Sequence, residues 1–205
     1  KKVLFPALKR KYKDYSFKNP KMDALFMDTD NIDTISFMDH NSVKKTSKST
    51  PITYIQSFDI IRRLFASQKI AKAKKFNMKH FSFNVKGGRC ENCKGLGIVT
   101  IEMQFLSDIT LKCENCKGNR YKDELLKIKF QGKTISDVLN LTVNEACEFF
   151  ITHQEVRIAN QIKPLMDVGL GYLQLGQSLS TLSSGEAQRI KLASFLSNKT
   201  KNSIL

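Results

Sequence analysis

The hexapeptide Cys-Glu-Asn-Cys-Lys-Gly occurs twice in this chain, at residues 90–95 and at residues 113–118. Nineteen residues lie between Cys93 of the first copy and Cys113 of the second. Two Cys-x-x-Cys turns at this spacing are typical of a four-cysteine zinc site, in which an intervening hairpin brings the turns together. The repeat therefore predicts that distant parts of the sequence meet around one metal ion.

The predicted zinc site is structural and not catalytic. Four thiolates fill the tetrahedral coordination of zinc and leave no position for a reactive water molecule. The expected ligands are Cys90, Cys93, Cys113 and Cys116. Gly95 and Gly118 are expected at positive φ, which such turns commonly need. The alternatives are four free buried cysteines or two redox pairs, and the duplicated hexapeptide disfavours both. Cys147 stands alone and is expected to be a small buried residue.

The composition predicts a soluble, cytoplasmic chain that binds nucleic acid. Hydrophobic residues make up 41% of the 205, which is enough for a packed core. No stretch approaches the roughly 20 apolar residues that cross a bilayer. The net charge is +15, and residues 41–95 hold 13 Lys or Arg against Asp59 and Glu91. Such concentration favours phosphate contacts, although a coding bias towards lysine is an alternative because only seven of the 34 basic residues are Arg.

The hydrophobic pattern predicts an α+β chain. Strands are expected at 25–27, 35–38, 81–85, 98–106, 109–112 and 125–130, with a polar loop over 41–52. Helices are expected after Ser57 and Thr142, over roughly 155–167, and from Ser183 or Ser184 to near Ser197. The helix after Ser57 would bury one face made of Phe58, Ile61, Leu64, Phe65 and Ile70.

A second motif, Leu182-Ser-Ser-Gly-Glu-Ala-Gln-Arg189, opens the last predicted helix. Ser183 and Glu186 have the spacing of a capping box, and Gly185 lets the backbone approach a ligand closely. A capped helix N-terminus with free amides can bind an anion. The alternative is an ordinary capped helix without a ligand.

The motifs of this chain resemble, in their order, the C-terminal half of the UvrA family of excinuclease ABC proteins. They are Phe81-Ser-Phe-Asn-Val-Lys-Gly-Gly-Arg-Cys90, the two cysteine pairs, Arg120-Tyr121, Leu165-Met-Asp-Val-Gly-Leu170, Leu175-Gly-Gln-Ser178 and Leu182 to Arg189. The resemblance is dense from about Thr50 to Leu196. It implies part of an ABC-type ATPase that senses DNA damage in nucleotide excision repair.

The resemblance also implies roles for particular residues. The ABC signature, which contacts the terminal phosphate of an ATP held by another domain, would include Ser183, Ser184, Gly185, Glu186 and Gln188. The hairpin between the cysteine pairs would project towards DNA, and phosphate contacts would come from Lys86, Arg89, Lys112 and Arg120. The implied cofactors are one Zn²⁺ and a shared ATP. The implied partners are damaged double-stranded DNA, a UvrB-like subunit, plus a second UvrA-like subunit, with no membrane.

The expected architecture is a partial ABC-type ATPase domain with an inserted zinc-ribbon-like hairpin module. Its expected parts are a partial nucleotide-binding core with a basic helical linker (1–80), the zinc module (81–130) and a helical signature region (131–205). Ser184 stands where the family's signature has Gly, and His40 where the family usually has Gln. No G-x-x-x-x-G-K-[ST] phosphate loop occurs, and no Asp-Glu strand follows the signature. The chain is therefore expected to be a fragment that does not hydrolyse ATP alone.

Two other functions are compatible with some of these motifs. A UvrA-like paralogue in transport or drug resistance would keep all of them. A DnaJ-like zinc-binding chaperone module would share Cys90-x-x-Cys93-x-Gly95-x-Gly97. The chaperone repeat, however, occurs four times in that family, and here the second copy has Arg120 in place of its last Gly.

Overall fold

The computed structural model describes residues 3–11, 14–22, 34–35, 46–103, 108–197 and 203–204, of which 34–35 and 203–204 are described by backbone alone. The chain forms two compact units, residues 1–41 with 198–205, and residues 42–197. In the described residues, no helix is both long and apolar enough to cross a membrane.

The described residues of the first unit form one short helix and a two-stranded parallel pair. Helix α1 (Leu4–Lys11) ends in Lys9, Arg10 and Lys11, whose charges suit the negative end of the helix dipole. Strands β1 (Thr34–Ile35) and β6 (Ser203–Ile204) pair in parallel. Three of the sequence expectations lie outside the described residues: the strand at 25–27, most of the strand at 35–38, and His40.

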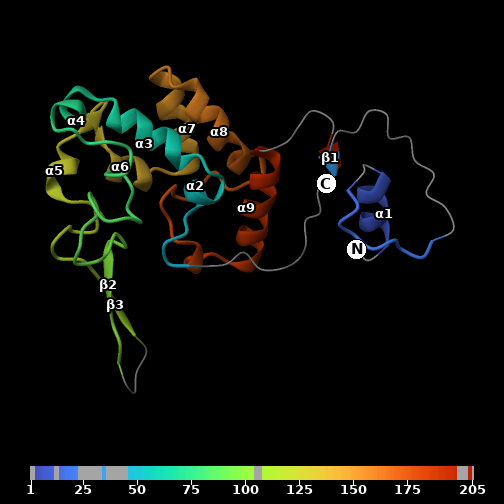
Figure 1. The fold of residues 1–205 in the computed structure, drawn as a ribbon. Helices are drawn as coiled ribbons and strands as arrows, with labels where there is room; N and C mark the ends of the chain where they lie inside the picture. Colours follow the sequence, from blue (N-terminus) through green and yellow to red (C-terminus); the bar gives the residue numbers. More distant parts are fainter. Residues whose placement is uncertain are drawn as a thin grey trace. The chain divides into compact units, whose positions relative to one another are not determined.

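The second unit is mostly helical (Figure 1). Its helices are α2 (Pro51–Tyr54), α3 (Phe58–Ala66), α4 (Lys69–Ala73), α5 (Asp123–Leu126), α6 (Ile135–Asn140), α7 (Val143–Thr152), α8 (Val156–Asp167), the 3-10 turn η1 (Leu179–Thr181) and α9 (Ser184–Ser197). Its strands form two antiparallel hairpins, β2 (Ile98–Ile101) with β3 (Ile109–Lys112), and β4 (Lys129–Phe130) with β5 (Lys133–Thr134). The predicted α+β class is confirmed.

Capping boxes fix the starts of three of these helices. Thr50, Thr134 and Thr142 each accept a hydrogen bond from the backbone N–H three residues later, and that residue's side chain accepts one in return. Each box satisfies amide groups that a helix start would otherwise leave unpaired. The helix start expected at Thr142 is therefore confirmed, whereas the loop expected over 41–52 already gives way to a helix at Pro51.

One continuous core joins the helices to the segment that leads into the first cysteine pair. Helix α8 packs against both α7 and α9, and α2 packs against α9. Phe81 and Phe83 are fully buried with Phe65 and Phe58, and the phenol of Tyr121 donates to the carbonyl oxygen of Phe81 at 3.0 Å. Aromatic burial of this size contributes several kcal/mol, at about 25 cal/mol per Å². The predicted boundaries at residues 80 and 130 both fall inside this compact unit.

The structure corrects several of the predicted elements. The strand expected over 98–106 ends at Ile101 as β2. Residues 81–85 form bends and not a strand, because their backbone amides bond locally: the Ser82 N–H donates to the Lys79 carbonyl at 3.1 Å and the Asn84 N–H to the Ser82 hydroxyl at 3.3 Å. The strand expected over 125–130 is the end of helix α5 followed by β4. The acids in the first turn of α5, Asp123 and Glu124, favour the helix start.

The helix expected after Ser57 is also shorter than predicted. It ends at Ala66, and Ile70 lies in the next helix, where it is 49% exposed. Ser57 makes no side-chain capping bond to α3. Its buried hydroxyl donates instead to the carbonyl oxygen of Gln161 at 3.3 Å, which ties the start of α3 to α8.

Candidate functional site

The four cysteines of the repeat meet in one buried cluster. The Sγ atoms of Cys90 and Cys113 lie 3.9 Å apart, and those of Cys93 and Cys116 lie 3.6 Å apart. All four ligand atoms lie within 4.8 Å of one another. Tetrahedral coordination at a metal–sulfur distance of about 2.3 Å requires sulfurs roughly 3.8 Å apart, whereas a disulfide would require about 2.05 Å. The donor set and its spacing therefore fit a metal ion and do not fit disulfides.

Both copies of the hexapeptide fold into the same turn. Lys94 and Gly95 have φ of 51° and 85°, and Lys117 and Gly118 have 49° and 87°. The positive φ predicted for both glycines is confirmed, and the left-handed conformation of the two lysines was not anticipated. In the first copy this conformation closes the turn, because it lets the Gly95 N–H donate to the Cys90 carbonyl at 3.2 Å.

The surroundings of the two turns differ. A Cβ atom on Gly95 would lie 1.9 Å from the carbonyl oxygen of Phe83, whereas one on Gly118 would meet nothing within 4 Å. The first turn is therefore pressed against the core and the second faces outward. Backbone hydrogen bonds from Cys90 to Arg120 and from Lys122 to Gly88 close the base of the module.

Neighbouring groups set the charge on the sulfurs. Burial raises the pKa of the Cys113 thiol, but hydrogen bonds from the Cys116 backbone and the Asn92 amide outweigh it and lower that pKa to about 6. Burial raises the pKa of Cys116 to about 12. Four thiolates this close together need a bound cation to hold them all in the charged form.

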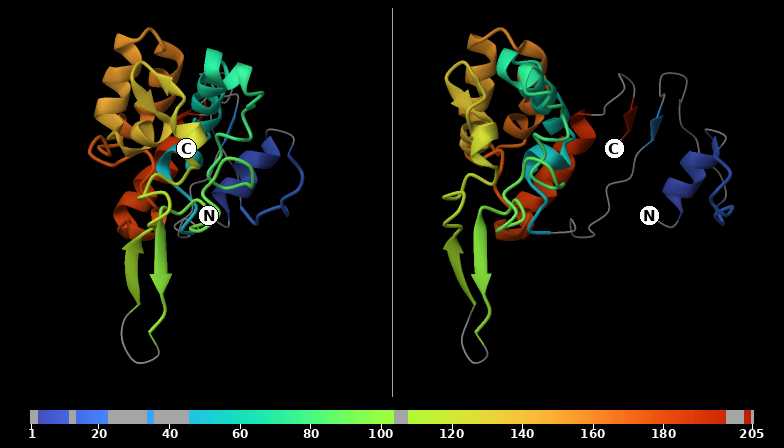
Figure 2. Two further views of the ribbon diagram at one scale, coloured as in Figure 1. Left: turned by 90° about the vertical axis from the view of Figure 1, so that its left-hand side faces the viewer. Right: turned by 60° about the vertical axis from the view of Figure 1, so that its left-hand side comes forward.

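The β2–β3 hairpin extends from this cluster, away from the helices of its unit (Figures 1 and 2). Its register pairs Ile98 with Lys112 and Ile101 with Ile109. Apart from Val99, which packs on the cysteines, every residue of both strands is exposed. Exposed apolar side chains on the hairpin are Ile98, Ile101, Met103, Ile109 and Leu111.

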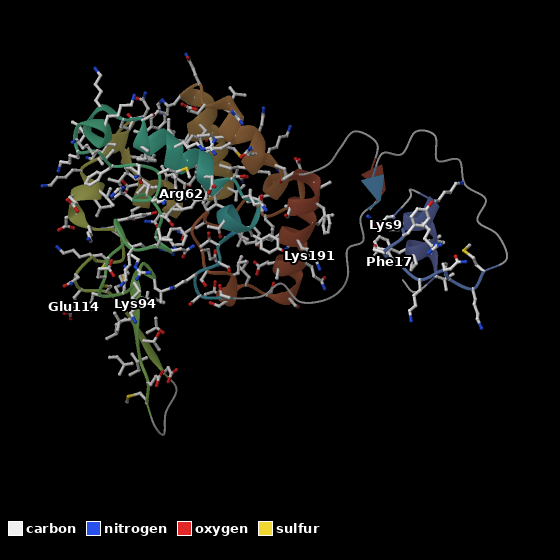
Figure 3. The ribbon with its side chains drawn as sticks, in the orientation of Figure 1. Lys9, Phe17, Arg62, Lys94, Glu114 and Lys191 are labelled. Atoms are coloured by element: carbon white, nitrogen blue, oxygen red, sulfur yellow. The ribbon has the colours of Figure 1, made fainter. Side chains whose placement is uncertain are left out.

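The hairpin itself is not basic. Its described residues, 98–103 and 108–112, carry one Lys against one Glu and one Asp. Its base carries charges of both signs: Lys86, Lys94, Lys117 and Lys122 are exposed there, and so are Glu91, Glu114 and Asp123. Figure 3 shows Lys94 and Glu114 at this position.

The four predicted DNA contacts fall into two structural groups. Lys86 and Lys112 are exposed. Arg89 is 9% exposed, and its guanidinium donates to the Asn84 carbonyl at 3.1 Å and lies 3.5 Å from the carboxylate of Glu91. The guanidinium of Arg120 is committed inside the protein as well, to the carbonyl of Gly176 at 2.7 Å. The two arginines therefore hold the base of the module in place, whatever else they contact.

A larger basic surface lies on helices α3 and α4 and the turn after them. No acidic residue occurs between Asp59 and Glu91. The exposed cations of this stretch are Arg63, Lys69, Lys72, Lys74, Lys75, Lys79 and Lys86. We call this set the α4 basic surface. The charge count over residues 41–95 located this segment, and the outer helix face expected to carry Arg62, Arg63, Lys69 and Lys72 is exposed except at Arg62, which is half-buried.

The signature segment opens helix α9 with a further anchored N-terminus. Ser183 is the capping residue: its hydroxyl accepts from the Glu186 N–H at 3.2 Å, and its own N–H donates to the Glu186 carboxylate at 2.8 Å. Ser184, Gly185 and Gln188 are exposed, and a Cβ on Gly185 would meet nothing within 4 Å. The capping box predicted from the spacing is confirmed. The exposed first turn of α9 already holds one carboxylate, that of Glu186.

Tyr172 is a neighbour of the signature that the sequence did not reveal. Its hydroxyl donates to Oε1 of Glu186 at 2.6 Å. Hydrogen bonds from Tyr172 and then from Ser183 lower the pKa of Glu186, and the same bond to Glu186 raises the pKa of Tyr172. Arg189, one turn further along, donates to the carbonyl oxygen of Gly169 at 3.3 Å. The loop before the signature is thus fastened to α9 at two points.

The chain closely resembles proteins named UvrABC system protein A. It is 53% identical over 176 residues to the protein of Clostridium perfringens, covering 86% of this chain and 18% of that protein. It is 49% identical over 203 residues to the protein of Clostridium acetobutylicum, covering 99% of this chain and 21% of that protein. With the protein of Aquifex aeolicus the identity is 52% over 170 residues, covering 83% of this chain and 18% of that protein.

A solved structure agrees with these relatives. The crystal structure of UvrA2 from Deinococcus radiodurans matches with a TM-score of 0.75 and 46% identity, covering 83% of this chain and 21% of that one. No protein-family model matches the chain. The chain spans about a fifth of the length of the relatives it matches. Sequence and fold together show that this chain belongs to the UvrA family and corresponds to one part of such a protein.

Proposed function

We propose that this chain supplies a zinc-stabilised, DNA-contacting module and an ABC signature to a cytoplasmic UvrA-type ATPase that recognises damage in nucleotide excision repair. The observation that carries the proposal is the near 50% identity to UvrABC system protein A over most of the chain. The buried four-sulfur cluster and the open, capped start of α9 support it, because each has the geometry that its assigned role needs.

Zinc is the metal that the cluster would hold. Four cysteine sulfurs in tetrahedral spacing select zinc or iron among the common metals, and a closed four-thiolate site without redox partners is usual for structural zinc. The ion would fasten the two turns to each other. The hairpin would then keep a fixed direction relative to the core, which its own exposed strands cannot provide.

Duplex DNA would contact the exposed lysines around the hairpin base and on the α4 basic surface. Phosphate contacts need cations that are free to reach a ligand. Lys86 and Lys112 meet that condition, whereas Arg89 and Arg120 would act by positioning the module. Damaged duplex is the proposed substrate.

ATP would be shared with parts of the protein outside this chain. Exposed amides at the start of α9 would contact the terminal phosphate, with the signature residues Ser183, Ser184, Gly185, Glu186 and Gln188 forming or supporting the contact. The chain alone would not hydrolyse ATP. The proposed protein partners are a UvrB-like protein and a second UvrA-like subunit.

Salt-dependent DNA binding by the full-length protein that contains this segment tests the proposal. Lys72→Glu with Lys75→Glu should reduce the slope of log affinity against log salt by about 0.9 for each phosphate that the protein no longer neutralises. Arg157→Glu with Lys163→Glu, which changes two exposed cations of α8, a helix that packs on α7 and α9, is the matched control and should leave the slope unchanged. Equal slopes for both pairs would remove the DNA-contact role of the α4 basic surface.

A second candidate is a UvrA-like paralogue that acts in transport or drug resistance, because the chain also matches a protein named UvrA2 and a paralogue would keep the same motifs. The same assay separates the two candidates when a lesion-containing duplex and an undamaged duplex are compared. Tighter binding to the lesion supports the repair role. No measurable DNA affinity at low salt would favour the paralogue.

A further inference from the structure

Glu186 is the centre of a small hydrogen-bond network at the start of α9. One carboxylate oxygen, Oε2, accepts from both the backbone N–H and the hydroxyl of Ser183 at 2.8 Å. The other, Oε1, accepts from the hydroxyl of Tyr172 at 2.6 Å. Tyr172 itself is 57% exposed, so its ring contributes little to the core. The hydrogen bond to Glu186 is the main contact that its hydroxyl makes.

The hydroxyl proton of Ser183 is already used in this arrangement. It points to Glu186, while the Ser183 oxygen accepts from the Glu186 N–H. A serine hydroxyl has one proton, so Ser183 can donate to a phosphate oxygen only if it releases the carboxylate. Phosphate binding and the full capping box therefore compete for one proton.

We propose that Tyr172 is a positioning residue for the signature, whose hydroxyl keeps Glu186 fixed while the Ser183 hydroxyl turns from that carboxylate to the terminal phosphate of ATP. The inference rests on the proposed nucleotide role of this helix start. It adds to that role a residue outside the signature motif and a specific exchange of one hydrogen bond.

The Glu186 carboxylate needs a second hydrogen-bond donor when the Ser183 hydroxyl turns to the phosphate. Once the Ser183 hydroxyl has left, Glu186 keeps the Ser183 N–H and the Tyr172 O–H as donors. Without Tyr172 the exposed carboxylate would keep the Ser183 N–H and water as donors, but it would be free to swing towards the phosphates, where charge repulsion would oppose binding. The guanidinium of Arg189 also faces Glu186 and the Tyr172 hydroxyl, and it donates to the Gly169 carbonyl.

The test uses the full-length protein and the variant Tyr172→Phe, which removes only the hydroxyl. The KM for ATP should rise about five-fold, in line with the loss of one hydrogen bond to an exposed charged group, while kcat changes less. The acid limb of the pH–rate profile should also move to higher pH. The Tyr172 hydrogen bond lowers the pKa of Glu186, and protonated Glu186 can no longer accept from Ser183 and Tyr172 together.

A double-mutant cycle shows whether Tyr172 acts through Glu186. In a Glu186→Ala background, which removes the acceptor for the Tyr172 hydroxyl, Tyr172→Phe should have no further effect on KM. Tyr54→Phe is the matched control, because residues 46–103 and 108–197 offer the Tyr54 hydroxyl no hydrogen-bond partner. Wild-type kinetics for Tyr172→Phe, an equal effect in both backgrounds, or a lower kcat with an unmoved acid limb would each overturn the inference.

A separate variant tests the proposed function on which the inference rests. Gly185→Asp adds a charged side chain where backbone would meet phosphate, and it should abolish ATP hydrolysis. If Gly185→Asp leaves hydrolysis intact, the nucleotide role of the helix is wrong. If Gly185→Asp is inactive but Tyr172→Phe behaves as wild type, only the positioning role of Tyr172 fails.

Discussion

Arg120 and Gly176 are 56 positions apart in the chain, and Nη2 of Arg120 donates a hydrogen bond to the carbonyl oxygen of Gly176 at 2.7 Å. Arg120 follows the second cysteine pair, and Gly176 lies in the loop that leads to α9. The same guanidinium stacks over the ring of Phe83 at 5.3 Å, and the N–H of Gly176 donates to the Leu139 carbonyl at 2.7 Å. One side chain thus fastens the metal module to the helical part of its unit.

Arg120→Ala should lower the free energy of unfolding by about 2 kcal/mol, because it removes a charge-assisted hydrogen bond and leaves the Gly176 carbonyl unpaired. Urea unfolding followed by circular dichroism measures the change. Arg157→Ala, at an exposed position of α8, is the matched control and should cost less than about 0.5 kcal/mol. Equal effects of the two substitutions would contradict the role of Arg120 as a tether.

Cys116→Ser should release the metal and unfold the segment from 90 to 118. Zinc-finger peptides gain about 10–16 kcal/mol from their metal, so the loss of one thiolate removes most of what holds the two turns. Metal analysis should fall from one equivalent of zinc to near zero, and limited proteolysis should cut within this segment. Cys147→Ser, which changes the one other cysteine, should keep a full equivalent. Unchanged protease resistance in Cys116→Ser would show that the metal does not hold the hairpin.

The two glycines of the repeat should respond very differently to alanine. Gly118→Ala should cost about 1–2 kcal/mol, the strain of a left-handed conformation at a position with free space around it. Gly95→Ala adds to this strain a Cβ atom 1.9 Å from the Phe83 carbonyl, so the turn must move off the core. We expect weakened zinc retention in Gly95→Ala alone, measured by the rate of transfer to a chelating dye. Similar rates in both variants would mean that the contact with Phe83 does not fix the turn.

The capping box of α7 should make the stability of the chain depend on pH. Hydrogen bonds from the backbone and hydroxyl of Thr142 lower the pKa of Glu145 in the folded state. Since the folded pKa lies below the unfolded one, this contribution is fully present above the unfolded pKa and is lost as the pH falls through the folded pKa. Thr142→Ala should therefore reduce the melting temperature at pH 7 more than at pH 3. An effect of equal size at both pH values would show that the ionised carboxylate is not involved.

The local features of the fold could be predicted from short stretches of sequence. Four features follow from residues only a few positions apart: the cysteine turns, their positive-φ glycines, the capping box at Thr142 and the span of α9. The predictions failed where distant packing decides the backbone. Residues 81–85 alternate like a strand, but their amides bond to Lys79 and Ser82 and the Phe81 carbonyl accepts from the distant Tyr121 in place of a neighbouring strand. Ile70 would lie on the apolar face of α3 only if that helix continued past residue 70. Helix α3 ends at Ala66, so Ile70 does not belong to that face.

The sequence by itself determined which four sulfurs could bind a metal and which segment could form the signature, because a turn or a helix cap depends on contiguous residues. The tertiary structure alone showed that Arg89 and Arg120 are engaged inside the protein, that Tyr172 reaches Glu186, and that the hairpin is exposed on both strands. These contacts join residues up to 56 positions apart. Their existence depends on how helices pack around a shared core, which no local pattern of residue types specifies.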